Sequence, residues 1–219
     1  MAHDIRGRLI AGLGLPGAGK SAVFAALASV LSQEGMTPAL VREPEEDQWP
    51  AAVRNRDVAG YITALTWFRS QRVPALFEAA AVRDAGGVAL VDSYYDKLIH
   101  LYFDHPGFEW LMKRTDPYRA VYQQLIAIDH RNLPDADCVV DIVVSRDRWY
   151  ELVRGRGREL DRTAGVLDTF DTQPAFTQAA QRYCKDRGIP YISFENVHST
   201  ALAAATALRG QLKTAGVLP

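Results

Sequence analysis

One glycine-rich turn constrains this chain more than any other stretch of it: Gly14-Leu15-Pro16-Gly17-Ala18-Gly19-Lys20-Ser21. The apolar run Arg8-Leu13 precedes the turn, and from Ser21 to Glu34 apolar residues recur at helical spacing. A strand, a turn and an amphipathic helix in this order are typical of an α/β sheet, in which ligands bind beyond the carboxyl ends of the strands.

The turn matches the pattern G-x-x-x-x-G-K-[ST], which has a physical meaning only in this strand, turn and helix context. Its glycines allow backbone angles and a close approach that a Cβ atom would prevent, so that amide groups at the start of the helix surround a phosphate. Lys20 supplies positive charge to the β- and γ-phosphates, and the Ser21 hydroxyl is placed to bind Mg²⁺. The alternative is a flexible loop with coincidental residues. The residues expected to bind the phosphates of ATP are Gly14, Gly17, Ala18, Gly19, Lys20, Ser21 and, from a later segment, Arg156.

The rest of the chain alternates between apolar runs and segments with helical spacing. Four further apolar runs predict strands over 38–41, 88–91, 138–144 and 190–194. Helical spacing predicts helices over 58–85 with a kink at Pro74, and over 116–130, 147–154, 172–187 and 200–214. Five buried strands separated by helices predict a single domain over residues 1–219, with a three-layer α/β/α fold and a five-stranded parallel sheet.

Charge and composition exclude several classes of partner. The 219 residues carry a formal net charge of −1, so no overall basic field draws the protein onto nucleic acid or an anionic membrane. No apolar run approaches the roughly 18–20 residues needed to cross a bilayer, and Cys138 and Cys184 form no CxxC pair. We therefore expect a cytoplasmic protein with no nucleic-acid partner and no membrane segment.

Acidic residues follow the second and third predicted strands, at the edge of the sheet where the turn lies. Glu43 is suited to orient or deprotonate an acceptor hydroxyl, or to align a substrate cation; a solvated acidic turn over 43–47 is the alternative. Asp92 is suited to hold Mg²⁺ through water or to act as a base, and Tyr94 and Tyr95 offer faces for stacking. A capping aspartate followed by amphipathic tyrosines would give the same pattern.

Two arginine-containing segments complete the candidate site. Four arginines lie within residues 154–162, where they would neutralise a transferring phosphoryl group and close the site, which predicts an arginine lid over about 154–165. Nucleic-acid binding and a solvated helix end are the alternatives there. Arg69 and Arg72 follow Trp67 and Phe68 in the long predicted helix, an arrangement suited to a flat base and an anionic group. An apolar core stripe explains the two aromatic residues better.

These motifs resemble those of the thymidylate kinase and deoxynucleoside kinase superfamily of P-loop phosphotransferases over most of the chain. The similar stretches are Arg42-Glu43-Pro44, Phe68-x-x-x-Arg72, Asp92-Ser93-Tyr94, Leu133-Pro134-Asp135 and Arg158-Glu159-Leu160-Asp161-Arg162. The resemblance implies a five-stranded P-loop NTPase core, ATP with Mg²⁺ as the phosphoryl donor system, an arginine lid and often a homodimer.

Departures from these motifs leave the phosphoryl acceptor open. Ser93 stands where the family has arginine, Lys97 where a serine is common, and Leu101-Tyr102 where thymidylate kinases usually have Tyr-Gln. Trp49 lies one residue later than the corresponding tryptophan of typical deoxynucleoside kinases, and the glutamate-arginine-serine that follows their third strand is absent. The chain fits neither subfamily cleanly.

The hypothesis that accounts for these features is an ATP-dependent phosphotransferase acting on a nucleotide or nucleoside, nearest to thymidylate kinase. The alternatives are a deoxynucleoside kinase, a specialised small-molecule hydroxyl kinase and an ATP-binding regulatory switch. The expected catalytic residues are Lys20, Asp92, Glu43, Arg154 and Arg158. The expected substrate-binding residues are Glu43, Arg69, Arg72, Tyr94 and Lys97, and the expected Mg²⁺ ligands are Ser21 and Asp92.

Overall fold

The computed structural model describes residues 7–157 and 166–219, and these contain a five-stranded parallel sheet. The strands lie side by side in the order β2-β3-β1-β4-β5, and every neighbouring pair is parallel. They are β1 (Arg8–Leu13), β2 (Ala39–Val41), β3 (Val88–Val91), β4 (Cys138–Val143) and β5 (Tyr191–Glu195). The predicted α/β fold with a five-stranded parallel sheet is confirmed.

Helices cover both faces of this sheet. The longer ones are α1 (Lys20–Gln33), α4 (Tyr61–Asp84), α6 (Arg119–Asn132), α7 (Arg146–Arg156), α8 (Gln173–Arg187) and α9 (Ala201–Thr214). The short helical segments are η1 (Glu46–Gln48), α2 (Ala51–Arg54), α3 (Arg56–Ala59), α5 (Tyr95–Leu98), η2 (Ile99–Leu101), η3 (Pro106–Phe108) and η5 (Val166–Thr172). Within the described ranges, no helix is both long enough and apolar enough to pass through a membrane.

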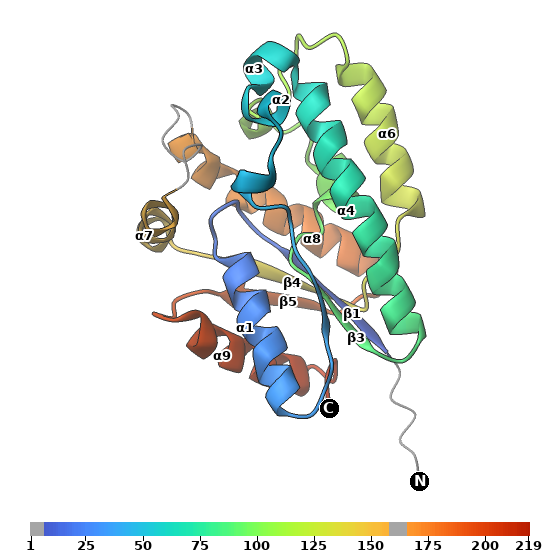
Figure 1. Ribbon diagram of the computed structural model, residues 1–219, viewed down its shortest axis with the longest axis vertical. Coiled ribbons are helices and arrows are strands. Elements are labelled where there is room, and N and C mark those ends of the chain that lie inside the picture. The colour runs from blue at the N-terminus through green and yellow to red at the C-terminus, as the bar shows by residue number, and fades with distance from the viewer. Residues whose placement is uncertain (1–6, 158–165) are drawn as a thin grey trace.

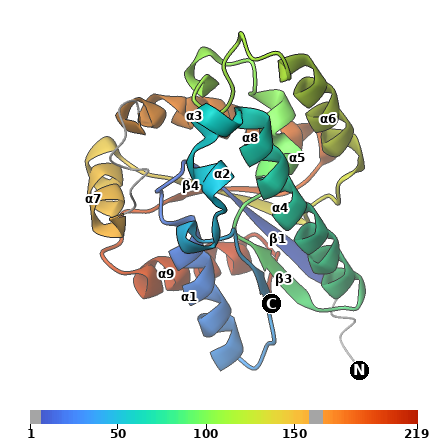
Figure 2. The same cartoon turned by 45° about the horizontal axis from the view of Figure 1, so that its top comes forward.

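The helices form two layers around the sheet. Figure 1 shows α1 and α9 together on one face, and α4 and α8 on the other, with α6 beside α4. Figure 2 shows α2 and α3 against the beginning of α4, and in both views α7 and α4 flank the start of α1. The start of α1 therefore lies between α7 and α4.

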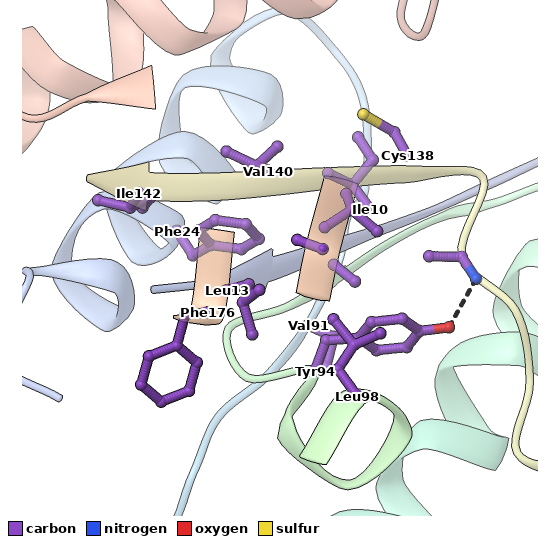
Figure 3. Close-up of a cluster of buried hydrophobic side chains, with 14 of the residues drawn as sticks. Ile10, Leu13, Phe24, Val91, Tyr94, Leu98, Cys138, Val140, Ile142 and Phe176 are labelled. Atoms are coloured by element: carbon purple, nitrogen blue, oxygen red, sulfur yellow. Dashed lines mark hydrogen bonds between the residues drawn. The ribbon is translucent and has the colours of Figure 1, made fainter. Parts of the chain in front are cut away.

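The strands are apolar on both faces because helices cover both faces. β3 is buried along its whole length, and in β1 only Arg8 is not fully buried. Figure 3 shows part of the core that results, in which strand and helix side chains meet; labelled there are Ile10, Leu13, Phe24, Val91, Tyr94, Leu98, Cys138, Val140, Ile142 and Phe176.

The long helix predicted over 58–85 begins later than expected. Val58 lies in the separate short helix α3, and α4 starts after Gly60, whose φ of 89° and ψ of 142° interrupt the helical path. The predicted start was wrong because the spacing of apolar residues does not register a break at one backbone position. α4 then continues through Pro74 to Asp84.

Candidate active site

A cavity of about 650 Å³ opens at the carboxyl ends of β1, β2 and β3. Its walls include the glycine-rich turn with the start of α1, the segments that follow β2 and β3, and parts of α3, α4 and α7. This is the edge at which parallel α/β sheets bind their ligands. The predicted site residues that line the cavity are Gly14, Gly17, Gly19, Lys20, Ser21, Glu43, Arg72 and Arg156.

The glycine-rich turn has a backbone that glycine adopts without strain. Gly14, Gly17 and Gly19 have φ values of 134°, 86° and 87°, in a region that residues with a side chain rarely enter. A Cβ atom on Gly14 would lie 2.3 Å from the carbonyl oxygen of Ile142, so the turn passes too close to β4 to accept a side chain. Because α1 begins at Lys20, the positive end of its dipole lies at this turn.

Two side chains from distant elements hold the turn in place. The indole Nε1 of Trp149 in α7 donates to the carbonyl oxygen of Pro16 at 2.8 Å, and Nδ2 of Asn196 donates to that of Ala18 at 3.0 Å. Both side chains are buried, and sequence reasoning missed both. Asn196 directly follows β5 at the edge where ligands bind, which was an available signal. For Trp149 the sequence offers none.

The side chain of Lys20 packs against the turn and lines the cavity. Its Nζ donates to the carbonyl oxygens of Gly14 and Leu15 at 3.0 and 2.9 Å. Burial lowers the pKa of Lys20, and the carboxylates of Glu43 and Asp92 partly offset this effect. The ammonium group is therefore held against the loop that would bind phosphates, and the charges of the two acids that follow β2 and β3 act on it.

Asp92 is a buried carboxylate with one unused oxygen. The side chain is 2% exposed, and its Oδ1 accepts a hydrogen bond from the backbone nitrogen of Glu43 at 3.0 Å. Its Oδ2 is buried and makes no hydrogen bond of normal geometry within the described chain. Burial, reinforced by the charge of Glu43, raises the pKa of Asp92 to about 6, although Ser21 and Lys20 act in the opposite direction.

The residues around Asp92 fit a bound Mg²⁺. No group of three or more His, Cys, Asp or Glu side chains in ranges 7–157 and 166–219 is arranged to hold a metal ion. Mg²⁺ in phosphoryl-transfer sites usually takes only one or two carboxylates, together with substrate phosphates and water. The buried Oδ2 of Asp92 and the cavity-lining hydroxyl of Ser21 are oxygen atoms of the kind such a site requires.

Arg72 connects the two acidic segments. Its Nη1 lies 3.1 Å from Oε1 of Glu43, and its Nε and Nη2 lie 2.6 and 3.2 Å from the carboxylate of Asp96. Burial alone would raise the pKa of Glu43, but Arg72 and Lys20 outweigh it, so that this pKa lies below its ordinary value. Sequence reasoning did not identify Asp96.

Aromatic side chains form another part of the cavity wall. Trp49 and Phe68 both line it and meet edge to face, with ring centroids 5.1 Å apart. Trp67 also meets Phe68 edge to face, with ring centroids 5.0 Å apart, and does not line the cavity. Tyr95 lines the cavity, 4.8 Å from the guanidinium of Arg72. Flat apolar surfaces of this kind suit a planar ring.

Comparison with known proteins identifies a kinase-like fold. No protein-family model matches the chain. Thymidylate kinases from three strains of Xanthomonas campestris pv. campestris are each 31% identical to it over 99 residues, which cover 42% of this chain and 43% of each relative. The match thus spans less than half the length of these relatives.

Two solved structures resemble nearly the whole chain. A deoxyadenosine kinase from M. mycoides with bound dATP matches with a TM-score of 0.68 at 15% identity, covering 94% of this chain and 99% of that one. A thymidylate kinase from Candida albicans matches with a TM-score of 0.61 at 17% identity, covering 95% and 92%. The chain has the P-loop kinase fold. The predicted resemblance to thymidylate kinases and deoxynucleoside kinases is confirmed at the level of the fold.

In this P-loop kinase fold, three residues expected to bind substrate lie away from the cavity. Arg69 is held by Asp129 of α6 through two hydrogen bonds of 2.6 and 2.7 Å. Tyr94 is 1% exposed, and its hydroxyl donates to Pro134. Lys97 is also buried, and its ammonium group lies 2.7 Å from Asp135. Each of these polar groups is thus bound to another part of the protein.

The arginines of the predicted lid have different positions in the P-loop kinase fold. Arg156, at the end of α7, lines the cavity, and its charge contributes to the lowered pKa of Lys20. Arg154 is exposed on the same helix and does not line the cavity. Arg158 lies outside the described residues. The lid predicted over about 154–165 is therefore described only at its start.

Proposed function

We propose that this chain is an ATP-dependent phosphotransferase that acts on a nucleoside or a nucleoside monophosphate. The observation that carries the proposal is one cavity with two chemically different sides. One side is a phosphate-binding turn with Lys20 and Ser21, and the other combines the Glu43 and Arg72 pair with the rings of Phe68 and Trp49. The first suits a triphosphate and the second a base joined to a polar group.

On the donor side, the backbone of the turn and the start of α1 bind the phosphates. Lys20 adds a positive charge next to them, and Arg156 approaches from α7. Ser21 and Asp92 would hold Mg²⁺, which when bound neutralises negative charge on the β- and γ-phosphates. Arg154 and Arg158 would add charge as part of a lid.

On the acceptor side, Phe68 and Trp49 offer faces to a planar base. Glu43 faces the same cavity and is suited to accept a hydrogen bond from the acceptor. Ser93 lines the cavity where related kinases have arginine, so a phosphate at this point lacks that positive charge. A hydroxyl acceptor would need Asp92 or Glu43 to take its proton, whereas a monophosphate acceptor needs no strong base.

A labelling experiment tests the proposal. Purified protein is incubated with radiolabelled ATP, Mg²⁺ and a panel of nucleosides and their 5′-monophosphates, and the products are separated. We expect transfer of the γ-phosphoryl group to at least one of them. Lys20→Ala should abolish transfer, whereas Lys185→Ala, which changes an exposed lysine of α8, should leave it unchanged. Equal labelling by the wild type and Lys20→Ala would contradict the assignment of the site.

The same experiment distinguishes the alternatives. Labelling of monophosphates alone favours a function close to thymidylate kinase, and labelling of nucleosides alone favours a nucleoside kinase. If MgATP binds but no acceptor in the panel is labelled, a kinase for another small molecule or a regulatory switch becomes the better hypothesis. A homodimer, a cytoplasmic location and the absence of a nucleic-acid partner stay predictions, open to light scattering, cell fractionation and filter binding.

A further inference from the structure

Three charged side chains, each in contact with the next, lead from the interior of the protein to the cavity. Asp96 is at the buried end, with a side chain 7% exposed, and Arg72 is next, at 11%. Glu43 is at the open end, with 38% of its side chain exposed. Arg72 and Glu43 line the cavity, whereas Asp96 does not.

The contacts show which end is fixed. Asp96 engages Arg72 through two of its nitrogens, at 2.6 and 3.2 Å, whereas Glu43 engages one, at 3.1 Å. The guanidinium also lies over two rings, with its carbon 4.8 Å from the centroid of Tyr95 and 5.4 Å from that of Phe68. Two parallel hydrogen bonds fix a guanidinium in direction as well as in position. Asp96 therefore holds the Arg72 guanidinium in place, and Glu43 makes its ion pair with this fixed guanidinium.

Glu43 is held at its backbone as well, because its amide nitrogen donates to Oδ1 of Asp92 at 3.0 Å. The backbone of Glu43 is thus set by the residue after β3, and its carboxylate by Arg72. Ser93 also hydrogen-bonds the Glu43 side chain, but without Arg72 a carboxylate that is 38% exposed would lose its ion pair and could adopt other rotamers. The orientation of the Glu43 carboxylate in the cavity thus depends on a residue outside the cavity.

We propose that Asp96 is a positioning residue, which holds Arg72 so that Arg72 in turn holds the Glu43 carboxylate toward the acceptor. The proposal rests on the proposed function, because Glu43 is taken to face the acceptor. Asp96 does not contact the acceptor itself. Its effect is on the geometry in which the acceptor meets the triphosphate, and such geometry is worth a large factor in rate, about 10²-fold for a displacement of about 1 Å.

The chain contains a matched control for this proposal. Arg69 lies on the same helix as Arg72 and makes a similar paired contact, at 2.6 and 2.7 Å, with Asp129, whose side chain is 4% exposed. Neither Arg69 nor Asp129 lines the cavity. Asp129→Asn therefore removes a buried partner of an α4 arginine without touching the connection to Glu43. The two aspartates should both matter for stability, but only Asp96 should matter for the acceptor.

Steady-state kinetics on the acceptor found by labelling gives the first test. Asp96→Asn should lower kcat by on the order of 10²-fold with KM for ATP changed by less than about twofold. Asp96→Glu, which restores a carboxylate, should recover part of the loss. Asp129→Asn should keep kcat within about threefold of the wild type once both proteins are compared well below their melting temperatures.

A double-mutant cycle then asks whether Asp96 acts through Glu43. In a Glu43→Gln background the added effect of Asp96→Asn should shrink to about threefold or less, because the group it positions is already altered. If Asp96→Asn causes the same fold-loss with and without Glu43, the proposal is overturned. An Asp96→Asn enzyme with an unchanged kcat also overturns it.

A spectroscopic test needs no acceptor and separates this proposal from the proposed function. The ¹H–¹⁵N signal of the Arg72 Nε–H group should be sharp and resolved in the wild type and in Glu43→Gln, and broadened by motion or exchange in Asp96→Asn. An unchanged signal in Asp96→Asn would show that Asp96 does not fix Arg72. Failure of the proposed function appears elsewhere, as the absence of any labelled product from a wild type whose Arg72 signal behaves as expected.

Discussion

Tyr94 offers a direct test of the difference between a substrate-binding residue and a core residue. Its ring lies in the core among Val91 and Leu98, and Figure 3 shows its hydroxyl in a hydrogen bond. The hydroxyl donates to the carbonyl oxygen of Pro134 at 2.7 Å and accepts from the backbone nitrogen of Ala136 at 2.9 Å. Tyr94→Phe keeps the buried ring and removes only this hydroxyl.

The expected cost follows from the groups that lose their partner. Ala136 is buried, so its N–H group has no access to water when the Tyr94 hydroxyl is gone, whereas Pro134 is only partly buried and its carbonyl can be hydrated. The Tyr183 hydroxyl, 3.0 Å from that of Tyr94, keeps its hydrogen bond to Asp135. One buried, unsatisfied backbone donor costs about 1–3 kcal/mol of folding free energy. At about 2–4 °C per kcal/mol for a domain of this size, a loss of about 2 kcal/mol lowers Tm by about 4–8 °C.

Thermal unfolding followed by circular dichroism measures this loss, and the KM for the acceptor is measured beside it. Tyr94→Phe should lower Tm and leave KM within about twofold. Tyr118→Phe, which changes a tyrosine that is 55% exposed, serves as the control and should alter neither quantity. A large rise in KM with an unchanged Tm would refute this reasoning and return Tyr94 to the acceptor site.

Three further outcomes follow from backbone geometry and burial. Gly19→Ala places a Cβ atom 2.8 Å from Nδ2 of Asn196, which braces the turn, at a φ of 87°. This variant should bind MgATP about tenfold or more weakly in calorimetry. Gly35→Ala, at a φ of 85° with open space around it, should bind MgATP as the wild type does. Burial raises the pKa values of Cys138 and Cys184 to about 12, so the native protein should not react with a thiol reagent at about pH 8 and should react at both cysteines once unfolded. Burial also raises the pKa of Asp141 in the folded state, so the contribution of Asp141 to stability is fully present below its unfolded pKa and is lost as pH rises through its folded pKa. Asp141→Asn should remove that loss in urea titrations between about pH 3 and pH 8. An unchanged pH dependence of the unfolding free energy would contradict the assignment.

The strands and long helices could be predicted because each shows an apolar run or a helical spacing over several residues. β1 and β3 have the predicted bounds, since each is a continuous apolar run that ends in glycine or an acid. The short helices α2, α3 and α5 have four residues each, about one turn, and so carry no periodic signal. The break at Gly60 gives no periodic signal either, because it depends on the backbone of a single residue.

The candidate site was predictable where one motif or one strand end fixes a residue. Lys20, Ser21 and Glu43 line one cavity because their positions depend only on the turn and on parallel strands ending at the same edge. The choice between Tyr94 and Tyr95 was not predictable. These neighbours lie where β3 gives way to α5, and the first is buried in the core while the second lines the cavity. The sequence shows two adjacent tyrosines but not which of them turns inward.

The order of the strands explains why Asp92 contacts both halves of the site. In sequence β2 lies between β1 and β3, but in the sheet β3 lies between β1 and β2. Val91 accordingly pairs with Ala11 on one side and with Val41 on the other, so the residue that follows it faces the turn after β1 and the segment after β2. This is why the charge of Asp92 is coupled both to Lys20 and to Glu43, and why no other residue directly after a strand occupies an equivalent place between those two described segments. A crossover that skips one strand position therefore brings the acid that would hold Mg²⁺ into contact with the acid that would face the acceptor.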